Sequence, residues 1–173
     1  MTVEIIRYAC SNYFSFRIIS LQVNLNYDIF IAMNNLISEL KSKLTPVFSQ
    51  ESKIISAYVF GSFVQGPTHP KSDIDLAILV SFDKRFSLDD LLNLEVKITL
   101  ALKTENYDLV VLNNAPLILK FRIISQGIII YNADDKLRCD FEEKVMQEYY
   151  DFLPRLREFN AEYFSALREN YLK

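Results

Sequence analysis

The sequence predicts an α/β (α+β) domain with a small β-sheet flanked by helices, followed by a long C-terminal helical segment. Almost uninterrupted apolar runs at residues 54–60, 75–80 and 107–112 are typical of short buried strands. The segments between and after them carry apolar residues every three or four positions, as helices do. At 173 residues, of which 50% are hydrophobic, the chain is long enough for one domain with a substantial core.

Residues 1–32 form an N-terminal extension whose role the sequence leaves open. Its apolar stretch is too short and too often interrupted by polar residues to span a membrane, and it lacks the cleavage site of a signal peptide. One interpretation is an extra strand or helix packed on the domain. The other, which we favour, is an upstream start codon that adds residues of little consequence.

The main domain is expected over residues 33–133. It opens with a helical pattern that Pro46 is expected to end, carried by Met33, Leu36, Ile37, Leu40 and Leu44. Strand 54–60 and strand 75–80 follow. Ser87 and Asp90 have the spacing of a capping box, and they predict a helix whose apolar side comprises Leu88, Leu91, Leu92, Leu94, Ile98 and Leu102.

A break at Asn106 precedes the strand at residues 107–112. Pro116 then opens a short helix that is expected to reach about Ser125, and Gly127 should stop it, because glycine is preferred just beyond helix ends. Residues 128–131 are a short fourth strand or an apolar linker.

Residues 134–173 form the C-terminal helical segment. Its apolar stripe recurs in steps of three or four at Leu137, Phe141, Val145, Tyr149, Phe152, Leu156, Phe159, Tyr163 and Leu167. Pro154 should kink or interrupt this helix. Before Pro154 the stripe is expected to pack on the domain. After it, a place in the core and a surface for a partner protein both remain open.

Composition restricts the class of function. The net charge is −3, the pI is near 5.3, and no lysine–arginine tract exists, so no long nucleic acid is expected to bind directly. No membrane association is expected either. Cys10 and Cys139 form no metal or redox motif, which suits reduced thiols in a cytoplasmic protein.

The stretch from Gly61-Ser62 to Asp73-Ile74-Asp75 carries the clearest chemistry. Side chains on a strand alternate between faces, so Asp73 and Asp75 should point the same way. Two like charges at the start of a buried strand are costly unless a cation lies between them. Paired carboxylate oxygens suit Mg²⁺.

A phosphate site is expected next to these carboxylates. Gly61 would let the backbone approach a ligand, and Ser62 with the amides after it could donate to phosphate oxygens. If the strand with Asp108 lies beside the strand with Asp75, three carboxylates converge, as two-metal phosphoryl or nucleotidyl transfer requires. Lys71 and Arg122 are weaker candidates for phosphate contacts, since such cations are more often solvated.

Gly61-Ser62, Asp73-x-Asp75 and the later Asp108 together resemble the nucleotidyltransferase fold of the DNA polymerase β superfamily. Within that superfamily, the chain is similar to the minimal nucleotidyltransferase (MNT) antitoxins of HEPN/MNT toxin–antitoxin pairs. The features that carry this closer resemblance are the ten-residue gap between Ser62 and Asp73, the short chain and the runs at 108–116 and 119–131. The resemblance covers residue 33 to the C-terminus.

The resemblance implies a small mixed sheet and a defined activity. Asp73 and Asp75 would bind Mg²⁺, with two ions expected, and Asp108 would complete the metal site or act as a base. Gly61 and Ser62 would hold a nucleotide triphosphate, ATP. The protein would transfer AMP to a tyrosine of a HEPN ribonuclease toxin within a hetero-oligomeric complex, and so neutralise that toxin by adenylylation (AMPylation).

Two other functions remain open from the sequence. A binding-only antitoxin would neutralise its toxin by occlusion, although the intact set of aspartates argues against this. A small-molecule nucleotidyltransferase of the aminoglycoside-modifying type shares the motif. Such enzymes usually carry a larger C-terminal substrate domain than the roughly forty residues that follow the last strand here.

Overall fold

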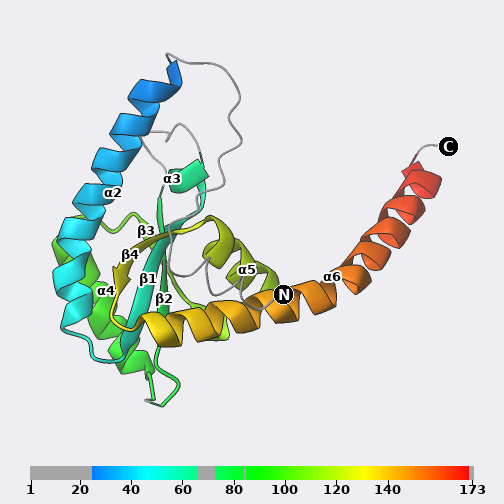
Figure 1. Ribbon diagram of the computed structural model, residues 1–173. Coiled ribbons are helices and arrows are strands. Elements are labelled where there is room, and N and C mark those ends of the chain that lie inside the picture. Colours follow the sequence, from blue (N-terminus) through cyan, green and yellow to red (C-terminus); the bar gives the residue numbers. More distant parts are fainter. Residues whose placement is uncertain (1–24, 66–72, 84, 172–173) are drawn as a thin grey trace.

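The computed structural model describes residues 25–65, 73–83 and 85–171 (Figure 1). Its centre is a four-stranded sheet with the strand order β3-β2-β1-β4. The strands are β1 (Ile54–Phe60), β2 (Ile74–Val80), β3 (Tyr107–Val111) and β4 (Ile128–Asn132). Strand β1 is antiparallel to β2 and β4, whereas β2 and β3 are parallel. The sheet is therefore mixed, and residues 128–132 form its fourth strand rather than a linker.

Helices cover both faces of this sheet. They are α2 (Leu25–Ser49), α3 (Ser62–Gln65), α4 (Leu88–Leu102), α5 (Leu117–Gln126) and α6 (Asp135–Tyr171), with a 3-10 turn η1 at Leu112–Asn114. Helices α2 and α4 pack on one face and α5 and α6 on the other, as Figure 1 shows. No helix in these described ranges is long and apolar enough to cross a bilayer.

Strand β1 is buried along its whole length. Its alternate side chains enter two separate cores: Ala57 and Val59 face α2 and α4, whereas Tyr58 and Phe60 face α5 and α6. A strand covered on both faces has no solvent side, which explains why its sequence is a continuous apolar run instead of an alternating one.

The capping box predicted at Ser87 is present at the start of α4. The Asp90 N–H donates to Ser87 Oγ at 3.2 Å, and the Ser87 N–H donates to Asp90 Oδ2 at 2.7 Å. Lys53, just before β1, also donates to Asp90. The hydrogen bond from Lys53, followed by those from Ser87, holds the pKa of Asp90 below its usual range.

Two predicted helix ends are wrong. Helix α2 begins at Leu25, before Met33, and it continues past Pro46 to Ser49. Its last turn includes Phe48, which is fully buried in the core, so packing holds the helix beyond the proline. Residues 1–24 lie outside the described ranges, and the two interpretations of the N-terminal extension are not distinguished.

Gly127 ends α5 as predicted, but for a different reason. Its backbone is extended rather than left-handed, with φ −72°. A Cβ atom at this position would lie 2.5 Å from the Ile123 carbonyl oxygen and 3.3 Å from that of Val59. Glycine is therefore required mainly by the close approach of its backbone to the last turn of α5, with β1 also near, and not by the conformation of a left-handed cap.

Helix α6 runs without interruption through Pro154. Figure 1 shows it bending in its orange part and then projecting away from the domain, as expected where a proline removes one backbone hydrogen bond. Before the bend, Tyr149 stacks on Phe121 of α5 with ring centroids 3.7 Å apart. After it, Phe159, Tyr163 and Phe164 are exposed, so this part of α6 adds nothing to the core.

A buried polar network ties α6 to the centre of the sheet. The Tyr58 hydroxyl donates to Glu142 Oε1 at 2.7 Å, and Arg138 Nη1 donates to the two oxygens of Glu142 at 3.0 and 3.1 Å. All three side chains are buried. Burial, followed by the charge of Glu142, raises the pKa of Tyr58 far above its usual value, so the phenol remains a donor.

We expect Tyr58→Phe to lower the free energy of unfolding by about 1–3 kcal/mol, because it removes a buried hydrogen bond to a charged acceptor. Urea denaturation followed by circular dichroism measures the change. Tyr150→Phe is the matched control: Tyr150 is exposed, and the loss there should stay within about 0.5 kcal/mol. Equal effects of the two variants would show that the network does not stabilise the fold.

Candidate functional site

The register of the sheet brings the predicted residues together at one end. Phe60, the last residue of β1, is paired with Asp75 of β2, and Asp75 is paired with Asp108 of β3. Gly61 follows β1 directly, and Asp73 precedes β2. Asp75 thus lies between the Gly61 turn on one side and Asp108 on the other. The juxtaposition of strands that the sequence analysis required is present.

Gly61 and Asp75 are in close contact. Gly61 has φ +75°, a conformation that residues with a side chain rarely adopt. A Cβ atom built on it would lie 1.8 Å from Asp75 Oδ2, inside the volume of the carboxylate. The Asp75 side chain therefore occupies the space that the missing side chain leaves, and both backbone conformation and space require glycine.

Asp75 carries an electrostatic cost. It is half-buried, and its pKa is raised first by burial, then by the charge of Asp108 and then by that of Asp73. Asp73 and Asp108 are exposed. Since each carboxylate disfavours ionisation of the middle one, a cation bound among them would relieve the repulsion.

Three carboxylates are the donor set that Mg²⁺ prefers, so these residues fit that ion chemically. Within the described ranges, however, no group of three or more histidine, cysteine or acidic side chains is already arranged to hold a metal. Like charges without a counter-ion repel one another, so binding an ion here would bring together carboxylates that are otherwise kept apart.

Ser62 begins α3 immediately after Gly61. This helix has a single turn, in which the Val64 N–H donates to the Gly61 carbonyl at 3.2 Å. Such a short helix has little macrodipole, so any phosphate contact here depends on individual N–H groups and the exposed Ser62 hydroxyl. The candidate cation Arg122 is exposed on α5, and Lys71 lies outside the described ranges.

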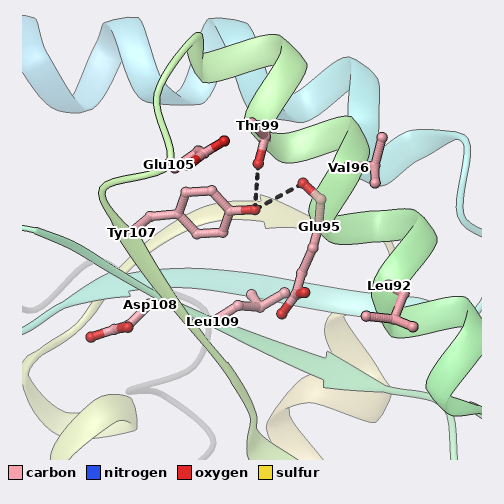
Figure 2. Close-up of a pocket in the computed structure, with 8 residues that line it drawn as sticks. All are labelled: Leu92, Glu95, Val96, Thr99, Glu105, Tyr107, Asp108 and Leu109. Carbon is pink, nitrogen blue, oxygen red and sulfur yellow. Dashed lines mark hydrogen bonds between the residues drawn. The ribbon is translucent and has the colours of Figure 1, made fainter.

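An open pocket of about 530 Å³ lies between α4 and β3 (Figure 2). It is lined by Leu92, Glu95, Val96, Thr99, Glu105, Tyr107, Asp108 and Leu109. The Tyr107 hydroxyl donates to the Glu95 carbonyl at 2.8 Å and lies 2.9 Å from Thr99 Oγ1. In Figure 2 the carboxylate of Asp108 points away from the side chain of Tyr107.

This pocket lies mainly on the α2–α4 side of the sheet, although Asp108, near the start of β3, also lines it. Tyr107 and Leu109 belong to the core on the α2–α4 side, whereas Val110 belongs to the core on the α5–α6 side. Alternation along β3 puts Asp108 on the same side as Val110. A triphosphate in the pocket would also be repelled by the carboxylates of Glu95 and Glu105, which line it. The sequence analysis did not anticipate the pocket, because periodicity cannot show how far a helix stands from a strand.

The sequence matches the family described as polymerase beta, nucleotidyltransferase, over residues 42–136, which is more than half of the chain and includes Gly61, Ser62 and all three aspartates. A comparison with curated proteins found no match.

Several solved structures with a similar fold are chains of toxin–antitoxin complexes. A chain of a toxin–antitoxin crystal structure with AMP-PNP is 26% identical, with a TM-score of 0.58 over 72% of this chain and 98% of that chain. A chain of a mutant MntA–HpeT toxin–antitoxin complex is 25% identical, with a TM-score of 0.54 over 76% and 98%.

A third structure holds a tri-AMPylated Shewanella oneidensis HEPN toxin with an MNT antitoxin. Its matching chain is 23% identical, with a TM-score of 0.56 over 74% of this chain and 98% of that one, and this likeness shows the fold alone. The family match and these likenesses confirm the resemblance stated from the motifs: the chain belongs to the polymerase β nucleotidyltransferase family.

Proposed function

We propose that this protein is a Mg²⁺-dependent protein adenylyltransferase and an antitoxin. It transfers AMP from ATP to a tyrosine of a HEPN-type ribonuclease toxin and thereby neutralises it. The observation that carries the proposal is the position of Asp75, which lies against Gly61 and beside Asp108. This arrangement supports nucleotidyl transfer because it joins a phosphate-binding turn to a set of metal-binding carboxylates.

Asp73, Asp75 and Asp108 would hold the metal, with two Mg²⁺ ions expected. When bound, Mg²⁺ lowers the pKa of an attacking hydroxyl and offsets the charge that develops on the phosphates. The raised pKa of Asp75 supports this role, since it arises first from burial and then from the negative charges of Asp108 and Asp73, all of which a bound cation would offset.

The residues of the chain would perform the remaining steps. Gly61 and Ser62 would bind the β- and γ-phosphates through N–H and hydroxyl donors. Asp108 is exposed and would accept the proton of the tyrosine hydroxyl, whose ordinary pKa is near 10. The phenolate oxygen then bonds to the α-phosphorus, the bond to the bridging oxygen breaks, and pyrophosphate leaves.

The similarity to chains of toxin–antitoxin complexes supports a protein acceptor and a HEPN partner in a hetero-oligomer, and the AMP-PNP in one of those complexes supports ATP. In the described ranges only α6 follows β4, with no second sheet to form a small-molecule domain. ATP, Mg²⁺ and reduced thiols suit a cytoplasmic protein.

Binding-only neutralisation is a second candidate, favoured by one observation. Phe159, Tyr163 and Phe164 on the projecting part of α6 are exposed and could bind a partner without any chemistry. Occlusion would need no carboxylate at residues 73, 75 and 108, and this difference separates the two candidates.

We expect a protein that co-purifies with the wild type to carry added AMP, and the same protein to be unmodified with Asp73→Asn/Asp75→Asn, because each amide removes a metal ligand at nearly constant volume. Intact mass spectrometry of the purified complex measures this. The control is Asp83→Asn, an exposed aspartate after β2, which should leave the modification unchanged. An unmodified partner with every form, together with full protection from its toxicity, would replace adenylylation with occlusion.

Asp75→Asn should stabilise the metal-free protein at pH 7.5 by about 0.5–1 kcal/mol, because it removes a repelled charge from a functional site. The pKa of Asp75 is raised in the folded state. As the pH falls through that value, Asp75 is protonated in the folded state before it is in the unfolded state, and the wild type becomes more stable relative to Asp75→Asn. The difference in free energy of unfolding between the two proteins should vanish below the ordinary carboxylate pKa near 3.9, where Asp75 is neutral in both the folded and the unfolded state.

Thermal unfolding across pH, with and without Mg²⁺, measures this effect. Mg²⁺ should raise the melting temperature of the wild type and leave that of Asp75→Asn almost unchanged, whereas Asp83→Asn should behave as the wild type does. A wild type that is more stable than Asp75→Asn without metal at pH 7.5 would contradict the repulsion argument.

A further inference from the structure

Helix α4 carries an exposed apolar ridge. Leu88, Leu92, Val96 and Leu100 are 69%, 50%, 59% and 72% exposed, respectively. Their spacing of four residues places them in one row along the helix. Four neighbouring large apolar side chains in contact with water mark an interaction surface more often than scattered single ones do.

The ridge has no role in the core of the domain. The opposite side of α4 already packs there through Leu94, Ile98 and Leu102, which are buried against α2 and the sheet. Figure 1 shows α4 beside α2, on the side of the sheet away from α5. The ridge therefore faces outward from the described part of the domain.

The charges at the two ends of the ridge are opposite. Asp89 lies in the first turn of α4, and Lys103 caps its last turn. Both side chains are exposed. At 100° per residue Asp89 lies on the side of the ridge, and Lys103 follows the helix directly, three residues after Leu100. A helix that is acidic at one end and basic at the other is electrostatically complementary to an antiparallel copy of itself.

We propose that this ridge is a homodimer interface in which two copies of α4 pack antiparallel about a two-fold axis at Val96. The charges select this register, because it sets Asp89 opposite the partner's Lys103. The same register sets Leu92 opposite the partner's Leu100. No other class of partner is needed, since one helix supplies both halves of each contact.

The ridge borders the neighbouring pocket. Leu92 and Val96 of the ridge also line it, together with Tyr107 and Leu109 of β3 (Figure 2). Asp75 lies on the opposite face of the sheet, so a contact made through the ridge itself leaves that carboxylate uncovered.

Sedimentation equilibrium of the full chain over a range of concentrations tests the proposal. We expect a dimer for the wild type and at least a 100-fold weaker association for Val96→Asp, because two carboxylates would meet at the axis. Asp89→Lys should weaken association, and Asp89→Lys/Lys103→Asp should restore it. Phe159→Asp on α6 is the matched control, exposed and aromatic, and should remain dimeric.

A cross-link tests the position of the axis. With Cys10 and Cys139 replaced by serine, Val96→Cys should oxidise to a disulfide-linked dimer at least tenfold faster than Glu148→Cys, an exposed control on α6. A monomeric wild type, or a dimer broken by Phe159→Asp and not by Val96→Asp, would overturn the proposal. So would an unchanged oligomeric state in Val96→Asp with loss of a co-purifying protein, which would assign the ridge to that protein.

Discussion

The register between β1 and β2 is the constraint on which the candidate site depends. It places Asp75 opposite Phe60, so that the carboxylate lies on the residue that follows β1. A shift of one residue would turn Asp75 toward α2 and α4 and bring a core side chain to the site. Burial of β1 on both faces prevents such a shift, because every one of its side chains already has a place in a core.

The two faces of the sheet differ in what they present. The carboxylates lie on the face covered by α5 and α6, and the same face contains the Tyr58–Glu142–Arg138 network. The pocket and the exposed row of α4 lie on the other face. A packed sheet separates most of these two sets of residues, with Asp108 at their border because it also lines the pocket. A substitution away from Asp108 on one face therefore need not disturb the other.

Local and alternating patterns could be read from the sequence. The buried strands and the capping box at Ser87 follow from side-chain period and local spacing. The grouping of Asp75 with Asp108 was conditional on the two strands being neighbours, which the resemblance implied and the sheet confirms. Which apolar side chains of a helix are buried was harder to predict from the sequence. Leu88 and Leu92 were grouped with Leu94 on one apolar side of α4, but they face outward, because apolar periodicity shows that a face exists and not which partner covers it. The continuation of α2 past Pro46 depended on tertiary packing of Phe48 that no local rule contains.

The continuity of α6 through Pro154 determines how its projecting half forms. An isolated helix of this length is marginal in water, because its first turn is costly to nucleate. Here the nucleus is supplied by the half that packs on α5 and β1, so the exposed half only has to propagate. A protein that meets Phe159 and Tyr163 therefore meets side chains already aligned on a helix, and binding does not begin with the ordering of a coil.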